Sequence, residues 1–267
     1  MSYDQRYAVP AEPGAWRTFD VGDPDPGYFQ FDWLSGRHPN LYHAFALTSV
    51  ALVDELTRRL DLSGLVVAEI AAGTGRCTVG LARHAHRVIA IDVYPSVIAF
   101  GAREFRRAGL DNCIHVQADM SAIPVKDASV DAVVCCWGFL NHAEAYRVLK
   151  PGGLIVHMEG ASGTSQTELA PILAREFPRL VPRPVSEPTQ APPVDDRIVG
   201  VVRPDIRLTD DAIDVHEFDH VADYGTPEEA AAILGRLFGP STAAYLRERK
   251  QSTVWSRLAI YSARIAK

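Results

Sequence analysis

Residues 65–75 read Leu-Val-Val-Ala-Glu-Ile-Ala-Ala-Gly-Thr-Gly, and this stretch decides how the rest of the chain folds. An apolar run that ends in small residues and two glycines predicts a buried parallel strand that turns sharply into a helix. Glycines at positions 73 and 75 allow the backbone to approach a ligand that a side chain would push away. The next helix aims its free N–H groups and its positive dipole end at that ligand. The stretch therefore predicts a nucleotide-type cradle.

Strand and helix patterns alternate along the rest of the chain. A helical spacing of apolar residues covers residues 41–60, with Asn40 as its N-cap. Beyond the cradle we expect strands at residues 87–92, 113–117, 129–136 and 154–158, and helices at residues 74–85, 95–108 and 143–149. Two late strands, at residues 206–222 and 254–265, flank a helix at residues 227–238. This order predicts an α/β fold, a Rossmann-like doubly wound sheet in a three-layer sandwich, mostly parallel with an antiparallel C-terminal edge strand.

Two segments outside the alternating pattern are interpreted as covers. Residues 1–40 are rich in proline, glycine and aromatic residues, and we expect an N-terminal arm that covers the core or closes over the ligand site as a lid. Residues 160–205 contain a possible helix at residues 167–177 followed by many prolines, and they are interpreted as an insertion or flap. Residues 41–267 are predicted to form one domain that carries this insertion.

Composition and charge limit the class of protein. The chain has 267 residues, 47% of them hydrophobic, and a net charge of -6, which is ordinary for a soluble globular protein and gives no basic footprint for nucleic acid. We expect no signal peptide, and no apolar run approaches the roughly 18–20 residues that span a bilayer. The cysteines lack metal-ligand spacing and are interpreted as packing residues in a reducing cytoplasm: Cys77, Cys113, Cys135 and Cys136. These features predict a cytoplasmic monomer or homodimer that binds neither nucleic acid nor membrane.

Chemically useful residues fall at the predicted carboxyl ends of four strands, where doubly wound sheets bind their ligands. The first strand contributes Glu69, Ala71, Gly73 and Gly75. The second strand ends in an acid, Asp92, placed to bond a pair of ribose hydroxyls, with Val93 after it. The third and fourth strands contribute Asp119, Met120, Cys136 and Trp137. One glycine turn is a weak signal, but the ordered set at four successive strand ends is much stronger.

This ordered set resembles the class I S-adenosylmethionine-dependent methyltransferases, in particular the small-molecule group. The resemblance covers residues 65–158, and it is carried by Glu69-Ile-Ala-Ala-Gly-Thr-Gly75, Ile91-Asp92, Ala118-Asp119-Met120, Val130-Asp131-Ala-Val-Val134 and Arg147-Val-Leu-Lys-Pro-Gly-Gly153. The last of these stretches is the most specific. The chain departs from the family's pattern at Ala71, where the family often has glycine, and in a shorter link from the fourth strand to Arg147.

The resemblance implies a role for each residue of the set. Gly73 and Gly75 would approach the methionine part of S-adenosylmethionine, while Glu69 would anchor the turn and bind the amino group of the cofactor. Asp92 would bind the ribose hydroxyls. Asp119 would bind the adenine amino group, and the Met120 backbone would bond a ring nitrogen. Cys136 would lie near the methionine part. Ala71, Val93 and Trp137 would lie beside these residues.

Methyl transfer by in-line SN2 displacement, which gives S-adenosylhomocysteine, requires mainly alignment and exclusion of water. A general base is needed only if an oxygen, nitrogen or carbon nucleophile must lose a proton. The candidate bases are His43, His142 and Glu159. No acidic triad has metal-ligand spacing, so no metal is expected. The two covers favour a small-molecule acceptor over a macromolecule.

Three other functions share parts of this pattern. A nicotinamide-dependent oxidoreductase would need glycines at positions 71, 73 and 76, but the chain has Ala71 and Arg76. A regulator or scaffold that binds S-adenosylmethionine without catalysis would share the cofactor residues, and so would an enzyme that uses this cofactor for cyclisation or decarboxylation. An assay for S-adenosylhomocysteine with a panel of acceptors separates a transferase from a binder.

Overall fold

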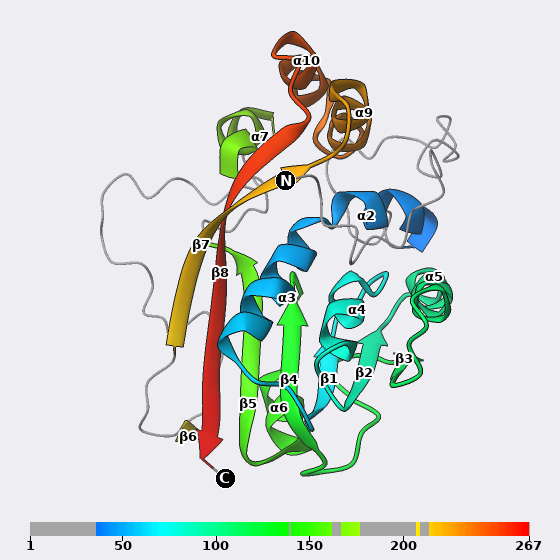
Figure 1. Cartoon of the computed structure of the whole chain (residues 1–267), viewed down its shortest axis with the longest axis vertical. Helices are drawn as coiled ribbons and strands as arrows, with labels where there is room; N and C mark the ends of the chain where they lie inside the picture. Colours follow the sequence, from blue (N-terminus) through cyan, green and yellow to red (C-terminus); the bar gives the residue numbers. More distant parts are fainter. Residues whose placement is uncertain (1–35, 139, 162–166, 177–206, 209–213, 267) are drawn as a thin grey trace.

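The computed structural model of the chain describes residues 36–138, 140–161, 167–176, 207–208 and 214–266 (Figure 1). The helices are α2 (Pro39–Phe45), α3 (Thr48–Arg59), α4 (Arg76–Ala82), α5 (Pro95–Arg107), α6 (His142–Val148), the 3-10 turn η2 (Thr167–Leu169), α7 (Ala170–Glu176), α9 (Pro227–Phe238) and α10 (Pro240–Glu248). The strands are β1 (Val66–Ile70), β2 (Arg87–Asp92), β3 (Cys113–Gln117), β4 (Val130–Cys136), β5 (Leu149–Gly160), β6 (Arg207–Leu208), β7 (Asp214–Asp223) and β8 (Thr253–Ala266).

The strands form one twisted sheet in the order β3-β2-β1-β4-β5-β8-β6, with β7 also paired to β8. Strands β1 to β5 run parallel to their neighbours, and β8 runs antiparallel to β5, β6 and β7. Because β1 lies between β2 and β4, the strand order reverses beside it, and a crevice forms there at the carboxyl ends of the strands. The predicted doubly wound, mostly parallel sheet is confirmed.

Alternate residues of each central strand pack into two different cores, which gives the molecule its three layers. Val67 of β1 joins Leu52 and Leu56 of α3 and Leu81 of α4 on one face of the sheet. Its neighbour Ala68 joins Ala145 and Val148 of α6 on the other face. The near-continuous apolar sequence of β1 therefore follows from its burial on both faces.

The expected antiparallel edge is confirmed, and the structure adds detail to it. Strand β8 pairs with β5 from Leu154↔Arg264 to Gly160↔Leu258. On its other side it pairs with β7 from Asp214↔Ser262 to Asp223↔Thr253. The C-terminal strand therefore lies inside the sheet, and the short β6 and the longer β7 lie outside it.

The single helix expected at residues 41–60 is two helices, α2 and α3, separated at Ala46 and Leu47. The two helices bury their apolar residues in different cores. Leu41 and Phe45 of α2 pack in a cap with α7, α9 and α10, whereas the α3 side chains pack on the sheet. One straight helix cannot serve two cores in different directions, so the chain bends between them.

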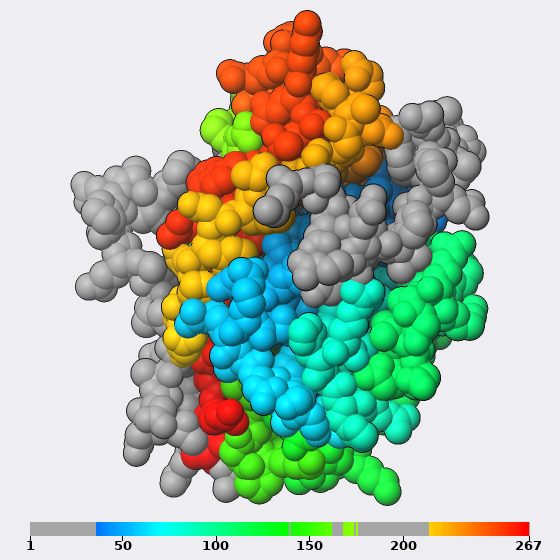
Figure 2. All heavy atoms as spheres, in the orientation of Figure 1, coloured from blue at the N-terminus to red at the C-terminus, as the bar shows by residue number. Residues whose placement is uncertain are grey.

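The cap is a second hydrophobic cluster at one end of the molecule, defined by α2, η2, α7, α9 and α10. Figure 2 shows the α9 and α10 segments (orange) projecting beyond the rest of the described chain. The helix expected at residues 167–177 is present as η2 and α7. The remainder of the predicted flap, residues 177–205, and residues 1–35 of the predicted arm lie outside the described residues, so both covers stay predictions.

The close contact between α9 and α10 in the cap can be tested by substitution. A Cβ at Gly235 would lie 2.5 Å from the Cβ of Ala243. We expect Gly235→Ala to lower the free energy of unfolding by about 1–3 kcal/mol, the usual effect of overpacking. Adding Ala243→Gly removes the clash, so the double variant should be more stable than the sum of the single effects.

Urea unfolding measures these four free energies. The matched control is Ala244→Gly, an exposed position on α10, which isolates the roughly 1 kcal/mol that glycine costs inside a helix. Strictly additive effects of the two substitutions would contradict a direct contact between the helices at this point.

Candidate functional site

The glycine-rich turn between β1 and α4 adopts left-handed backbone conformations at alternate residues. The φ angles are 57° at Ala71, 55° at Gly73 and 82° at Gly75. Glycine adopts such angles freely, whereas alanine loses about 1–2 kcal/mol. This accounts physically for the glycine that the family often has at the position of Ala71. The turn delivers the chain into α4, where Gly75 is the N-cap residue.

Asp92, the last residue of β2, holds this turn. One carboxylate oxygen accepts a hydrogen bond from the Gly73 N–H at 2.8 Å, and the other accepts from the Tyr94 N–H at 3.0 Å. Asp92 is 8% exposed, and burial raises the pKa of its carboxyl group while the backbone N–H donors lower it. The acid predicted at the second strand end therefore lies directly beside the turn.

Glu69 of β1 is a buried acid with one unsatisfied oxygen. The side chain is 1% exposed. Its Oε2 accepts a hydrogen bond from the Thr78 hydroxyl at 2.5 Å, while Oε1 has no partner in the described residues. Burial raises the pKa of Glu69 from 4.5 to about 7. An unpaired buried carboxylate oxygen is costly unless a ligand supplies a donor.

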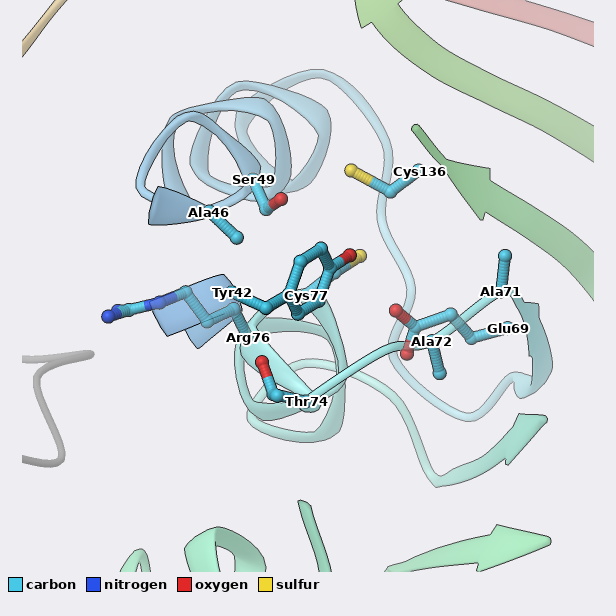
Figure 3. Close-up of a pocket in the computed structure, with 10 residues that line it drawn as sticks. All are labelled: Tyr42, Ala46, Ser49, Glu69, Ala71, Ala72, Thr74, Arg76, Cys77 and Cys136. Atoms are coloured by element: carbon cyan, nitrogen blue, oxygen red, sulfur yellow. The ribbon is translucent and has the colours of Figure 1, made fainter. Parts of the chain in front are cut away.

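A small pocket lies above the turn (Figure 3). Its walls come from β1 and the turn, from the first turn of α4, from the end of β4 and from the corner between α2 and α3. The lining residues are Tyr42, Ala46, Ser49, Glu69, Ala71, Ala72, Thr74, Arg76, Cys77 and Cys136. Of the residues proposed from the sequence, Glu69, Ala71 and Cys136 meet here.

Helix α2 docks on the turn through two consecutive residues. The ring of Tyr42 lies so close to Gly73 that a Cβ there would be 2.6 Å from the Tyr42 Cε1. His43 Nδ1 lies 2.9 Å from the Thr74 hydroxyl oxygen, and the Arg76 Nε–H donates to the His43 carbonyl at 2.5 Å. Burial, with Arg76 and Arg107 nearby, holds the pKa of His43 well below its usual range. His43 is therefore a neutral side chain that connects α2 to the turn.

The sequence did not predict that α2 and α3 form a wall of the pocket. Tyr42 and Ser49 sit in an apolar helical pattern that predicts a helix but not which strand end it approaches. The only available signal was the pair of polar residues Thr48 and Ser49 in the middle of that pattern, both buried in the structure. Serine and threonine are mostly exposed in proteins, so two of them inside an apolar helical pattern give only a weak signal for a polar contact.

Trp137 follows β4 with a φ of 59°, an unusual conformation for a bulky residue. Its backbone N–H donates to the Met158 carbonyl at 2.9 Å, and its buried indole Nε1 has no hydrogen-bond partner in the described residues. At the next residue, a Cβ on Gly138 would lie 2.5 Å from the Ala71 Cβ. The ends of β1 and β4 are therefore in close contact beside the pocket.

The remaining candidates lie outside the described pocket. Asp119 is exposed, and its carboxylate accepts from the Ser121 N–H at 2.8 Å. Val93 is 46% exposed. The others are half-buried: Met120 in the loop after β3, His142 at the first position of α6, and Glu159 near the end of β5. Their predicted roles stay predictions.

The described ranges of the chain contain no cluster of three or more His, Cys, Asp or Glu side chains that could hold a metal ion. They also contain no helix with the length and apolar character needed to cross a membrane.

Comparison with known proteins relates this site to one family. Residues 67–153 match the family described as "Methyltransferase domain". A demethylmenaquinone methyltransferase of Clavibacter sepedonicus is 37% identical over 105 residues, which are 37% of this chain and 42% of that protein. The ubiquinone/menaquinone biosynthesis C-methyltransferase UbiE of Escherichia fergusonii is 32% identical over 115 residues, which are 38% of this chain and 46% of that protein. The chain thus spans less than half the length of these curated relatives.

A solved structure extends the similarity in fold. A Bacillus halodurans protein assigned as a methyltransferase superposes with a TM-score of 0.51 at 17% identity, over 81% of this chain and 100% of that chain. At this identity the likeness shows the fold alone.

The raised pKa of Glu69 predicts a pH dependence of stability. The folded chain holds this proton more tightly than the unfolded chain, so wild-type stability falls as pH rises from 4.5 to about 7. In Glu69→Gln this loss is absent, and the difference in unfolding free energy between variant and wild type should grow by about 3 kcal/mol over that range. Urea unfolding at pH 5, 6, 7 and 8 measures the difference. A difference that stays flat would place Glu69 in a wetter environment.

Proposed function

We propose that this protein transfers the methyl group of S-adenosylmethionine to a small-molecule acceptor, because residues 67–153 match the family described as "Methyltransferase domain". The acceptor atom is an oxygen, nitrogen or carbon nucleophile, and S-adenosylhomocysteine is the second product. The observation that carries the proposal is the hydrogen bond from the Gly73 N–H to the Asp92 carboxylate at 2.8 Å. It brings a glycine turn and an acid together where doubly wound sheets bind nucleosides.

The chemistry of the site fits this cofactor. The free Oε1 of Glu69 suits the ammonium group of the methionine part. Each carboxylate oxygen of Asp92 has further acceptor capacity beyond its backbone bond, which suits ribose hydroxyls. Asp119 and the Met120 backbone, next to the end of β3, would hold the adenine on the open rim.

The cofactor supplies an electrophilic methyl group on a sulfonium. The chain must then align the acceptor atom and exclude water from the site. Closure of the site by α2 contributes to the exclusion of water. Among the three candidate bases, His43 is made a weak base by its low pKa and by its contact with Thr74. His142 and Glu159 are therefore the stronger candidates when the acceptor must lose a proton.

The relatives suggest which acceptor to test first. Their names refer to a demethylmenaquinone methyltransferase and to a C-methyltransferase of ubiquinone and menaquinone biosynthesis. We propose a demethylated quinol as the first acceptor, with methylation at carbon. The family match lies within residues 67–153, whereas α2, α7, α9 and α10 lie outside it, so phenols and amines belong in the same panel.

The decisive experiment is calorimetric titration with S-adenosylhomocysteine, with NAD as the control ligand, followed by an acceptor screen for methylated product. We expect micromolar binding of S-adenosylhomocysteine and no binding of NAD. Binding without methylation of any acceptor would favour a non-catalytic regulator or scaffold. Failure to bind S-adenosylhomocysteine would overturn the proposal.

Asp92→Ala tests the hydrogen bond between the Gly73 N–H and the Asp92 carboxylate. We expect the affinity for S-adenosylhomocysteine to fall by about 10- to 100-fold, because charge-assisted hydrogen bonds to the ribose and the support of the turn are lost. The matched control is Asp111→Ala, an exposed acid after α5. Circular dichroism shows whether both variants fold, and unchanged affinity in a folded Asp92→Ala protein would remove this residue from the site.

A further inference from the structure

The ring of Tyr42 occupies the space directly above the glycine turn. A Cβ at Gly73 would lie 2.6 Å from Cε1, 2.8 Å from the hydroxyl oxygen and 3.0 Å from Cζ of this ring. Figure 3 shows the ring in the middle of the pocket, between Ser49 of α3 and Glu69 of β1. A glycine at the first turn of a doubly wound sheet leaves room for a ligand to approach the backbone. Here the phenol of Tyr42 takes up that room.

Very little space remains in the pocket beside the ring. The enclosed space is about 10 Å³, which is room for about one water molecule. No group of S-adenosylmethionine is small enough to share this space with the phenol. In the described conformation the pocket therefore has the polar groups that suit the cofactor but lacks the space for it.

The phenol also lies among the acids that the proposed function assigns to the cofactor. Burial, followed by the nearby charges of Asp92, Cys136 and Glu69, raises the pKa of Tyr42 well above its usual range, so the phenol stays neutral. Oε1 of Glu69 nevertheless accepts no hydrogen bond from any described group. The ring thus fills the pocket without supplying the donor that this oxygen lacks. Because an unpaired buried oxygen is costly, a ligand that brings a donor can compete with the ring.

Helix α2 is anchored on both sides of Tyr42. Leu41 and Phe45 are buried in the cap, and His43 is buried with its Nδ1 2.9 Å from the Thr74 hydroxyl oxygen. Moving the whole helix would break these contacts together, whereas rotating the Tyr42 side chain about its own bonds breaks none of them. The ring is therefore the part that can leave the pocket at the lowest cost.

We propose that Tyr42 is a gate of the cofactor pocket, whose ring closes the space above Gly73 and rotates away to admit the cofactor. This inference rests on the proposed function and adds to it an autoinhibitory contact within the chain. Only the fraction of molecules with an open gate binds, so the apparent dissociation constant equals the intrinsic one divided by that fraction. The role of Tyr42 is to limit entry into the pocket, and the ring takes no part in methyl transfer.

The rates of ligand binding test the gate. Surface plasmon resonance on the immobilised full-length chain measures association and dissociation of S-adenosylhomocysteine. Tyr42→Ala removes the ring, and we expect at least about 10-fold faster association, because minor conformations are commonly populated at roughly 0.1–10%. The dissociation rate should change by less than about threefold, so the affinity should rise with the association rate.

Two further variants serve as controls. Tyr42→Phe keeps the ring and should associate within about threefold of the wild type, which would assign the gate to the ring and not to its hydroxyl. Tyr245→Ala is the matched control, since it removes a tyrosine ring from α10, where the hydroxyl contacts Glu168 in the cap. Its association rate should equal that of the wild type. If Tyr42→Ala does not fold, Tyr42→Leu replaces it, with an expected gain of about three- to tenfold in association.

Unchanged association in a folded Tyr42→Ala or Tyr42→Leu protein would overturn the gate and leave the proposed function standing. Weaker binding through faster dissociation would do the same, because the ring would then contact the bound ligand instead of excluding it. Failure of both the wild type and the variant to bind S-adenosylhomocysteine would overturn the proposed function itself.

Discussion

The hydrogen bond between the Gly73 N–H and the Asp92 carboxylate joins the ends of two neighbouring strands into one site. The bond forms only in the register that pairs β1 with β2 from Val66↔Arg87 to Ile70↔Ile91. A shift of one residue would move Asp92 away from the turn. The bond also fixes the left-handed turn at Gly73, which in turn sets the starting point of α4. The site therefore exists because the parallel sheet holds its register.

Helix α2 connects the site to the cap. Its apolar residues Leu41 and Phe45 belong to the cap, while Tyr42 and His43 contact the glycine turn. Successive residues of a helix point in different directions, so one short helix can belong to both cores. Helix α2 therefore links the packing of the cap directly to one wall of the pocket.

Burial gives the charged residues their functional properties. Glu69 and Asp92 both have raised pKa values because burial penalises their charged forms, but of these two acids only Glu69 has an oxygen without a hydrogen-bond partner among the described residues. Asp119 is the contrasting case. It is exposed, and the pKa of its carboxyl is lowered by hydrogen bonds from Ser121. Glu69 is thus held in a dry environment with one oxygen lacking a donor among the described residues, whereas Asp119 lies in solvent.

The sequence alone determined the parallel sheet, the glycine turn and the acid at the end of β2, because these depend on local patterns: apolar runs, glycine positions and the spacing between strand ends. It also predicted that Glu69 and Cys136 lie near each other, since adjacent parallel strands end at one edge, and both residues line the pocket. Only the tertiary structure decided that residues 41–60 form two helices, that β8 lies inside the sheet, and that Tyr42 and Ser49 form a wall of the pocket. Those features arise from packing between segments far apart in the chain, and no local pattern specifies which distant core a helix will join.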